Sequence, residues 1–322
     1  MERGTPNMTV SSTPEYPGYG SDNSTDYSEN ESSSGSLDFD DWLNILSLLI
    51  APFGLMGNGA VLWLLGFRIR RNHFSIYILN LAGADALFLC GSFLISIGRI
   101  FSYIFDELIW IILSCLTYMT YTVGLSLLAA ISTERCLSAL FPIWYRCHRP
   151  KHVSAAVCAG LWALAGVFWL LPFAIRESES LRRFNFFIIL GAWLLLLTCV
   201  MGVSSLTLLL RVQCSSRRRR PPRLYLLILL TVLVFLLCGV PWGFWIFVDF
   251  HLKIRVTPYW SCEFLSYVNS SVNPLIYFFV GRLGNRRREP LRMVLQRALG
   301  DEQELGGGTT NTPQTSSTEA IL

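Results

Sequence analysis

The chain has few charged residues for its length. Only 15% of its 322 residues are Asp, Glu, Lys or Arg, while 52% are hydrophobic; an average soluble domain has about 25% charged residues. The sequence also lacks a Gly-rich phosphate loop, a paired-carboxylate constellation and a convincing Cys/His site. These absences argue against an enzyme. The net charge of +4 does not indicate nucleic-acid binding, because the cations lie beside apolar stretches, where anionic lipid accounts for them.

The sequence contains long stretches of hydrophobic residues instead of frequent charges. About 20 apolar residues cross a bilayer core of roughly 30 Å, and a backbone in lipid must satisfy its own hydrogen bonds, so each run is predicted to be a helix. The predicted spans cover about 42–67, 74–98, 108–139, 152–175, 184–211, 224–250 and 258–281. The predicted fold class is therefore an all-α membrane protein, a seven-transmembrane helix bundle over 42–281.

The distribution of cations predicts the orientation of the bundle. Most of the 26 Lys and Arg residues follow the first, third, fifth and seventh spans. Cytoplasmic loops carry an excess of such residues. We therefore expect an extracellular N-terminus and a cytoplasmic C-terminus in a multi-pass protein.

The two tails are predicted to be disordered. Residues 1–41 are rich in Ser, Gly and acid and cannot bury enough apolar surface to fold alone. They lack an apolar signal-peptide core, so the first span is expected to direct insertion. Asn7, Asn23 and Asn30 each begin an Asn-x-Ser/Thr glycosylation triplet, as suits an extracellular tail. The tail over 301–322 is expected to be cytoplasmic, and its Ser and Thr residues can accept phosphates for a regulatory partner or remain unmodified.

An amphipathic segment follows the seventh span. Apolar residues recur at helical spacing within 282–300, with Arg residues interspersed. This pattern predicts a juxtamembrane helix on the inner leaflet. No Cys is present there for palmitoylation, so anionic membrane lipid is expected to help hold it.

Glu134 and Arg135 end the third span. An Arg beside an acid at the cytoplasmic lip can pair locally while the inner face is closed, and can be released when helices separate. The pair is therefore a candidate switch. A plain positive-inside anchor is the alternative explanation for Arg135.

Asp85 lies in the middle of the second span, where contact with lipid would be costly, so it must face the bundle interior. Its candidate partners are Asn58 on the first span and Asn269, Ser270 and Asn273 on the seventh. Such oxygen ligands suit a hard cation with bound water. We expect a sodium ion, acting as an allosteric modulator, at Asp85, Asn269, Ser270 and Asn273; a purely structural polar network is the alternative.

Two prolines interrupt the last two spans. Pro241 and Pro274 each remove a backbone hydrogen bond, and the resulting kinks are natural hinges. Tyr277, three residues after Pro274, can then swing its hydroxyl into the inner cavity. Prolines are also tolerated in membrane helices without any such role.

Aromatic residues gather at the predicted outer third of the bundle, with few charges among them. Such a pocket suits an amphiphilic or aromatic ligand, although interfacial anchoring would also explain the aromatics. The candidate pocket residues are Arg99, Tyr103, Thr117, Tyr118, Tyr121, Phe184, Trp242, Trp245, Asp249 and Glu263.

Taken in order, these motifs resemble the rhodopsin-like class of G-protein-coupled receptors, and more closely its Mas-related family, over nearly all of 52–300. The passages that carry the resemblance are 57–66, 75–81, 124–138, 141–147, 235–241, 277–281 and 294–299. The resemblance implies a plasma-membrane receptor that transmits binding of an extracellular peptide or small amphiphilic ligand to a heterotrimeric G protein. It also implies arrestin and receptor kinases as regulatory partners.

Single positions refine what the resemblance implies. Gly239 stands where the wider class carries a toggle Trp, as is common in this family, so activation should depend more on Pro241 and the outer helix ends. Thr117 stands where amine receptors carry Asp, which argues against a monoamine ligand. Trp110 replaces the Cys that links the third helix to the second outer loop.

Basic-ligand recognition does not carry over from the family. Several Mas-related members link the fourth and fifth helices through cysteines, and those with cationic peptide ligands use carboxylates at the adjoining ends. The stretch 169–190 contains no Cys, and its loop acids Glu177 and Glu179 are balanced by arginines.

Two other functions stay open at this point. One is a non-signalling or constitutively active modulator of another receptor. The second is a transporter or lipid scramblase, although transporters commonly show internal repeats and none is found here.

Overall fold

The computed structural model describes residues 1, 39–69, 72–101, 105–150, 152–174, 179–214, 223–241, 244, 259–282 and 290–299. Every regular element in these ranges is helical. The glycosylation acceptors Asn7, Asn23 and Asn30 and nearly all of the two predicted tails lie outside the described residues.

The helices follow the predicted spans closely. The long elements are α1 (Phe39–Trp63) with the π-helical turn η1 (Leu64–Arg68), α2 (His73–Ile100), α3 (Glu107–Leu140), α5 (Val153–Ala174), α6 (Glu179–Cys214), α7 (Arg223–Val234) with the π-helical turn η2 (Phe235–Gly239), and α9 (Tyr259–Arg282). Two short helices are α4 (Pro142–Cys147) and α10 (Leu291–Leu299). The two π-helical turns were not predicted.

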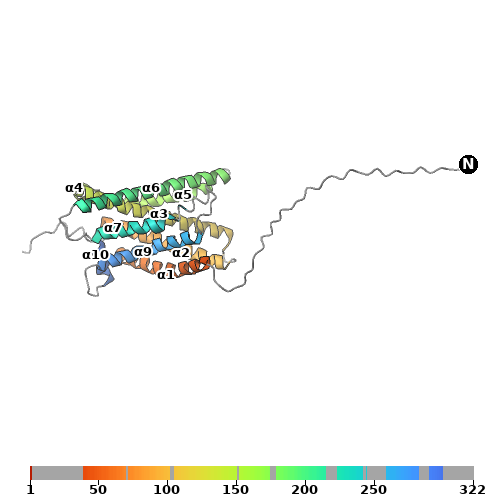
Figure 1. Cartoon of the computed structure of the whole chain (residues 1–322), viewed down its shortest axis with the longest axis horizontal. Helices are drawn as coiled ribbons and strands as arrows, with labels where there is room; N and C mark the ends of the chain where they lie inside the picture. The colour runs from red at the N-terminus through yellow and green to blue at the C-terminus, as the bar shows by residue number, and fades with distance from the viewer. Residues whose placement is uncertain are drawn as a thin grey trace, which may run out of the picture. The chain divides into compact units, whose positions relative to one another are not determined.

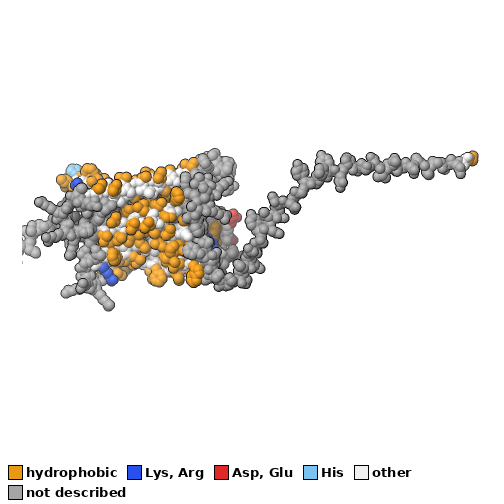
Figure 2. All heavy atoms as spheres, viewed as in Figure 1, with side chains coloured by type: hydrophobic (Ala, Val, Ile, Leu, Met, Phe, Trp, Pro, Cys, Tyr) orange, Lys and Arg blue, Asp and Glu red, His pale blue; other side chains and the backbone are white. Residues whose placement is uncertain are grey.

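Within the described residues, the helices that are long and apolar enough to cross a membrane are five: Trp42–Arg68, His73–Ile100, Glu107–Leu140, Val153–Leu170 and Ile188–Leu208. Hydrophobic side chains cover the middle of the described surface on the face that Figure 2 shows. Exposed large hydrophobic residues among the described ones include Leu49, Phe53 and Met56 on α1. A soluble monomer rarely exposes so wide an apolar surface, and a bilayer would cover it.

The centre of the bundle is formed by α2, α3 and α9. Helix α2 packs against α1, α3 and α9, while α3 also contacts α5 and α6, and α9 contacts α1, α7 and η2 (Figure 1). The short helices α4 and α10 lie at one and the same end of the bundle (Figure 1). One end is thereby marked by α4 and α10, and the other by the C-terminal turn of α2.

Local sequence explains where α2 begins. Asn72 precedes it, and its side chain accepts a hydrogen bond from the Ser75 amide at 2.7 Å. The Ser75 hydroxyl in turn accepts one from the Asn72 amide at 2.7 Å. This reciprocal capping box satisfies two amides that the first helical turn would otherwise leave unbonded.

The predicted amphipathic helix over 282–300 is described in part. Arg282 belongs to α9, residues 283–289 lie outside the described residues, and α10 covers Leu291–Leu299. Pro290 precedes it, and a proline is favoured at a helix start because it has no amide hydrogen to satisfy. The buried side of α10 consists of Val294, Leu295 and Ala298, and the helix packs on α9 and α7.

Candidate functional site

Three of the predicted partners of Asp85 form hydrogen bonds either with Asp85 or with one another. The Asn273 amide donates a hydrogen bond to the Asp85 carboxylate at 2.8 Å, and the Ser270 side chain also bonds to that carboxylate. Asn58 donates to the main-chain carbonyl of Ser270 at 3.0 Å. Asp85 is only 2% exposed, so this polar cluster holds α1, α2 and α9 together inside the bundle.

Two side-chain oxygens near this cluster have no hydrogen-bond partner among the described residues: Asn269 Oδ1 and Asn273 Oδ1. Both residues are buried. Buried polar atoms are nearly always bonded to protein or water. Amide, carboxylate and hydroxyl oxygens are the ligand types that a hard cation and its water prefer, so the residue types of this cluster suit the predicted ion.

A second buried cluster surrounds Glu134 near the end of α3. Its carboxylate pairs with Arg149 and accepts hydrogen bonds from the hydroxyls of Tyr145 at 2.9 Å and Tyr77 at 3.5 Å. Arg149 also donates to the Ser154 hydroxyl at 2.7 Å. The cluster therefore joins α2, α3, α4 and the start of α5.

The described partners of Glu134 are thus Arg149, Tyr145 and Tyr77, and its pairing with the neighbouring Arg135 stays a prediction. The Arg135 guanidinium lies over the Phe74 ring, 3.4 Å from its centroid, a cation–π contact. Sequence reasoning did not single out Arg149 or Tyr145; Pro142 at the start of α4 is the signal that this stretch is helical.

Aromatic side chains link α9 to η2 through the middle of the bundle. Tyr267 on α9 and Phe88 on α2 have ring centroids 6.0 Å apart, and Phe88 and Tyr121 on α3 have theirs 4.9 Å apart. The Tyr121 hydroxyl donates to the Gly239 carbonyl at 2.8 Å. Tyr121 and Gly239 were predicted as site residues, whereas Phe88 and Tyr267 were missed because apolar context gave no reason to single them out.

Gly239 lies close to two neighbours. A Cβ at this position would be 3.0 Å from the Leu125 side chain and 3.3 Å from Asn269 Oδ1. A Trp side chain has no room there in this arrangement. Pro241 comes two residues after Gly239, the last residue of η2, so the kink residue and the glycine lie close together in the chain just beyond α7.

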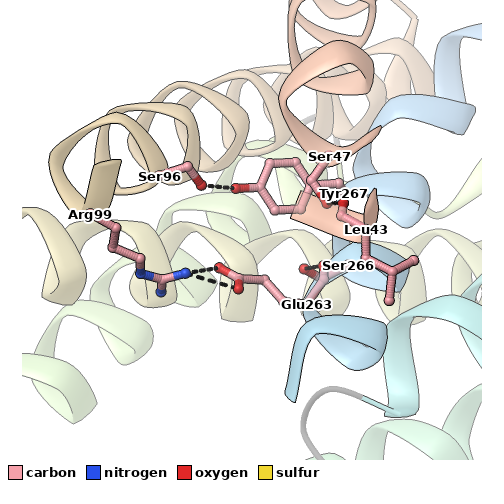
Figure 3. A network of polar contacts seen from close by, with 7 residues as sticks. All are labelled: Leu43, Ser47, Ser96, Arg99, Glu263, Ser266 and Tyr267. Atoms are coloured by element: carbon pink, nitrogen blue, oxygen red, sulfur yellow. Dashed lines mark hydrogen bonds and ion pairs between the residues drawn. The ribbon is translucent and has the colours of Figure 1, made fainter. Parts of the chain in front are cut away.

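Arg99 and Glu263 form an ion pair between the last turn of α2 and the first turns of α9. The Arg99 Nη1 donates to the two Glu263 carboxylate oxygens at 3.2 and 3.0 Å. Figure 3 shows the guanidinium pointing at the carboxylate, with Ser96 and Tyr267 nearby. The hydroxyls of Ser96 and Tyr267 are 3.0 Å apart and share a hydrogen bond.

The other predicted pocket residues differ in placement. Thr117 is buried, donates to the Leu113 carbonyl at 2.7 Å and lies against Gly91 of α2. Tyr118 stacks on Trp169 of α5, with ring centroids 5.5 Å apart. Predicted residues outside the described side chains are Tyr103, Phe184, Trp242, Trp245 and Asp249.

The predicted hinge in α9 is buried. Pro274 lies within the helix, and a Cβ on Gly57 of α1 would be 3.1 Å from its ring. Tyr277, one turn further on, is 2% exposed. A change at the kink would therefore displace α1 or bring Tyr277 into new surroundings.

Comparison with known proteins identifies the family. Residues 57–277 match the profile described as 7 transmembrane receptor (rhodopsin family). The chain is 46% identical over 288 residues to Mas-related G-protein coupled receptor member X1 of Homo sapiens, covering 84% of this chain and 87% of that receptor.

Two further relatives come from Macaca mulatta. Member X2 is 48% identical over 277 residues, covering 81% of this chain and 83% of the relative. Member X3 is 47% identical over 283 residues, with coverage of 84% and 87%.

Members of this family are multi-pass membrane receptors that act on G proteins; they are not enzymes. The apolar spans, the buried polar core and the matched length lead to the same conclusion: the chain belongs to the Mas-related G-protein-coupled receptors of the rhodopsin-like class.

Proposed function

We propose that this receptor transmits binding of an extracellular amphiphilic ligand, a peptide or a small molecule, from the outer ends of α2 and α9 to a heterotrimeric G protein at the end marked by α4. The observation that carries this proposal is the continuous series of buried contacts from Tyr267 through Phe88 and Tyr121 to Gly239. It connects the candidate ligand end to the helix that contains the Pro241 kink.

The topology proposed for this function has seven spans, with α7–η2 and α9 added to the five apolar helices. The inner side of α9 carries Ser266, Asn269, Ser270 and Asn273, all buried, which explains its lower hydropathy. We place the N-terminus outside and the C-terminus in the cytoplasm of a plasma-membrane protein, following the distribution of cations. Helix α10 would then rest on inner-leaflet lipid, with its exposed Leu291 and Met293 toward the bilayer.

The contact between Tyr121 and Gly239 would serve the role that a Trp at position 239 serves in the wider class. A ligand that moves Tyr267 would shift Phe88 and then Tyr121, and so change the bond that holds η2 to α3. Because η2 precedes Pro241, whose kink is a hinge, a small change there would alter the direction of α7. The proposal thus assigns the transmission role to stacked rings from three helices.

The Glu134 cluster is proposed as the inner switch. In the arrangement described, Arg149, Tyr145 and Tyr77 hold the acid between α2, α3 and α4. Outward movement of α7 would let a G protein reach Arg135, with Pro274 and Tyr277 adjusting in α9. Arrestin and receptor kinases are proposed as regulatory partners of the tail over 301–322, which carries several Ser and Thr residues.

A sodium ion is proposed at Asp85, Asn269, Ser270 and Asn273. The unbonded amide oxygens of Asn269 and Asn273 support it. Bound beside a carboxylate, the cation would supply positive charge and favour the closed arrangement in which α2 and α9 are joined.

The test is nucleotide exchange on purified G proteins by the full-length receptor in lipid nanodiscs, with a panel of amphiphilic peptides and small molecules. We expect accelerated exchange on at least one G-protein class, and its loss in Arg135→Ala with surface expression retained. No exchange with any class would contradict receptor signalling and favour a modulator of another receptor. Ion or lipid flux in proteoliposomes would instead favour a transporter or scramblase.

A further inference from the structure

We propose that the end of α1 that carries η1 is a binding site for an anionic phospholipid: Arg68 bonds the phosphate of the head group, and an acyl chain lies along α1 beside Trp63. The turn η1 precedes α2, whose early residue Tyr77 bonds to Glu134, so this is the end of the bundle marked by α4. The inference goes beyond the proposed function and takes from it only that this end faces the inner leaflet.

The site is built on a contact between an arginine and a tryptophan. The guanidinium carbon of Arg68 lies 5.0 Å from the centre of the Trp63 ring, a cation–π contact. Both side chains are exposed. The indole therefore holds the cation in one position at the surface, where a ligand can reach it, and less order has to be imposed on the arginine when the ligand binds.

The π-helical turn η1 brings these two residues together. Trp63 and Arg68 are five positions apart, and in an α-helix, with 3.6 residues per turn, such residues point in different directions. In η1 the hydrogen bonds join residues five apart, as between the Ile69 amide and the Leu64 carbonyl at 2.9 Å. Leu64 and Leu65 are buried, so the turn is anchored in the bundle while Arg68 stays at the surface.

The charge of Arg68 is not neutralised by the described part of the chain, where no carboxylate pairs with it. Arg211, an exposed arginine in the last turn of α6, likewise has no acidic partner among the described residues, but it lies on no aromatic ring there. A guanidinium presents a planar fork of donors that fits a phosphate through two parallel hydrogen bonds. Arg68 is thus a positioned cation whose donors can be used by a phosphate.

The surface of α1 beside this pair has room for an acyl chain. Met56, Gly59 and Trp63 are spaced by three and four residues, so they share one face of the helix. Met56, Trp63 and the nearby Phe67 of η1 are exposed hydrophobic residues. No atom lies within 4 Å of the position that a Cβ on Gly59 would take. The glycine therefore leaves a gap between two bulky apolar side chains, open to the bilayer.

Charge and position together select the class of lipid. A cation at the inner leaflet attracts anionic lipids, whereas a zwitterionic head group would bring its own ammonium close to Arg68. A free phosphate ion would pair with Arg68 without touching the gap at Gly59, and an exposed ion pair alone contributes little. An anionic phospholipid uses both parts of the site, the phosphate at Arg68 and the chain at Gly59.

The experiment measures lipid binding to purified full-length receptor in a nonionic detergent by native mass spectrometry, without G protein. The probes are dioctanoyl phosphatidic acid and dioctanoyl phosphatidylcholine, which have the same acyl chains. For the wild type we expect phosphatidic acid to bind about tenfold more tightly, a ratio that corresponds to about 1.4 kcal/mol. Arg68→Gln should weaken its binding about fivefold, as for the loss of one arginine beside an anionic lipid. Arg211→Gln, the matched control, removes the same charge and should have little effect.

The ring and the gap are tested separately. Trp63→Leu keeps the charge and an apolar side chain but removes the ring, and should weaken phosphatidic acid binding about threefold, the size of an exposed cation–π contact. Gly59→Leu fills the gap and should weaken binding of both lipids. Its control is Gly160→Leu on α5, an exposed glycine whose added Cβ would likewise meet no atom within 4 Å. All these positions are exposed, so the variants should keep the wild-type Tm.

The inference would be overturned by equal wild-type affinity for the two lipids, by equal losses in Arg68→Gln and Arg211→Gln, or by unchanged binding in Trp63→Leu or Gly59→Leu. Inorganic phosphate that displaces phosphatidic acid at equal concentration would show an ion site and not a lipid site. Because lipid binding is measured without ligand or G protein, a receptor that binds the lipid but drives no nucleotide exchange would contradict the proposed function alone.

Discussion

The hydroxyl of Tyr121 on α3 donates a 2.8 Å hydrogen bond to the carbonyl of Gly239 at the end of the π-helical turn η2. Pro241, two residues later, has no amide hydrogen to give to the helix, and π-helical turns also disturb the regular hydrogen-bond ladder. The internal hydrogen bonding of the helix is thus weakest at the stretch where the Tyr121 hydroxyl of α3 supplies a hydrogen bond. The bond from Tyr121 is placed to determine whether this stretch keeps its kink.

The first prediction concerns that bond. Tyr121→Phe keeps the ring against Phe88 but removes the donor, which should destabilise the closed arrangement by about 1 kcal/mol. Such a change shifts a two-state equilibrium roughly fivefold, so basal nucleotide exchange without ligand should rise by about that factor. Thr198→Val is the control, because its hydroxyl bonds only within α6, to the Leu194 carbonyl. Equal basal rates in the two variants would contradict the role of the bond.

The second prediction concerns the inner cluster. Arg149→Met leaves the Glu134 carboxylate buried with two tyrosine hydroxyls but without its cation. Removing one member of a buried pair costs about 3–5 kcal/mol, and we expect the lower end because the tyrosines remain. The measurement is the Tm of purified receptor.

Two further variants distinguish the effect of breaking the buried Glu134–Arg149 pair from the effect of losing a positive charge anywhere. Glu134→Gln combined with Arg149→Met should recover much of the lost stability, since no buried charge is then left alone. Arg292→Met removes an exposed arginine of α10 and should change Tm little. A loss in Arg149→Met no larger than in Arg292→Met would refute the buried pair.

The inner cluster also shows where sequence patterns stop being informative. Hydropathy predicted the helices because a bilayer imposes their length, and the cost of a charge in lipid placed Asp85 inside beside Asn273. No such rule identified Arg149 as the partner of Glu134. Their contact depends on the short helix α4 folding back on α3, and a charge count treats every loop arginine alike.

The aromatic series was only half predicted for a related reason. Tyr121 was identified as a pocket residue and Gly239 through its unusual position, but Phe88 and Tyr267 look like ordinary apolar residues of a span. Their importance comes from the way three helices bring rings within 4.9 and 6.0 Å of each other. Such contacts are long-range, and a periodic pattern within one helix does not contain them.

The third prediction concerns sodium. If a cation binds at Asp85, the wild-type receptor should be more stable in sodium chloride than in choline chloride at equal ionic strength. About 1 kcal/mol of stabilisation would raise Tm by about 2–4 °C. Asp85→Asn, which removes the charge but keeps the shape, should lose this difference. Asp106→Asn, an exposed acid before α3, should keep it. Identical wild-type Tm values in the two salts would contradict the site.

The fourth prediction concerns the contact between α9 and α10. A Cβ on Gly281 would collide with the main-chain oxygen of Val294 and lie 2.9 Å from its carbonyl carbon. A backbone atom cannot turn aside as a side-chain end can, so Gly281→Ala should push α10 away, at a cost of about 1–3 kcal/mol. We expect a lower Tm and faster hydrogen exchange of the α10 amides.

Gly202→Ala on α6 is the matched control, because nothing lies within 4 Å of the Cβ that it would add. Alanine also favours a helix over glycine by about 1 kcal/mol, so this variant should be neutral or more stable. A difference between the two glycines therefore isolates the close approach from the general preference for alanine. Should both variants behave alike in Tm and in α10 exchange, α10 would not rest on Gly281, and its proposed position on the inner leaflet beside α9 would have to be abandoned.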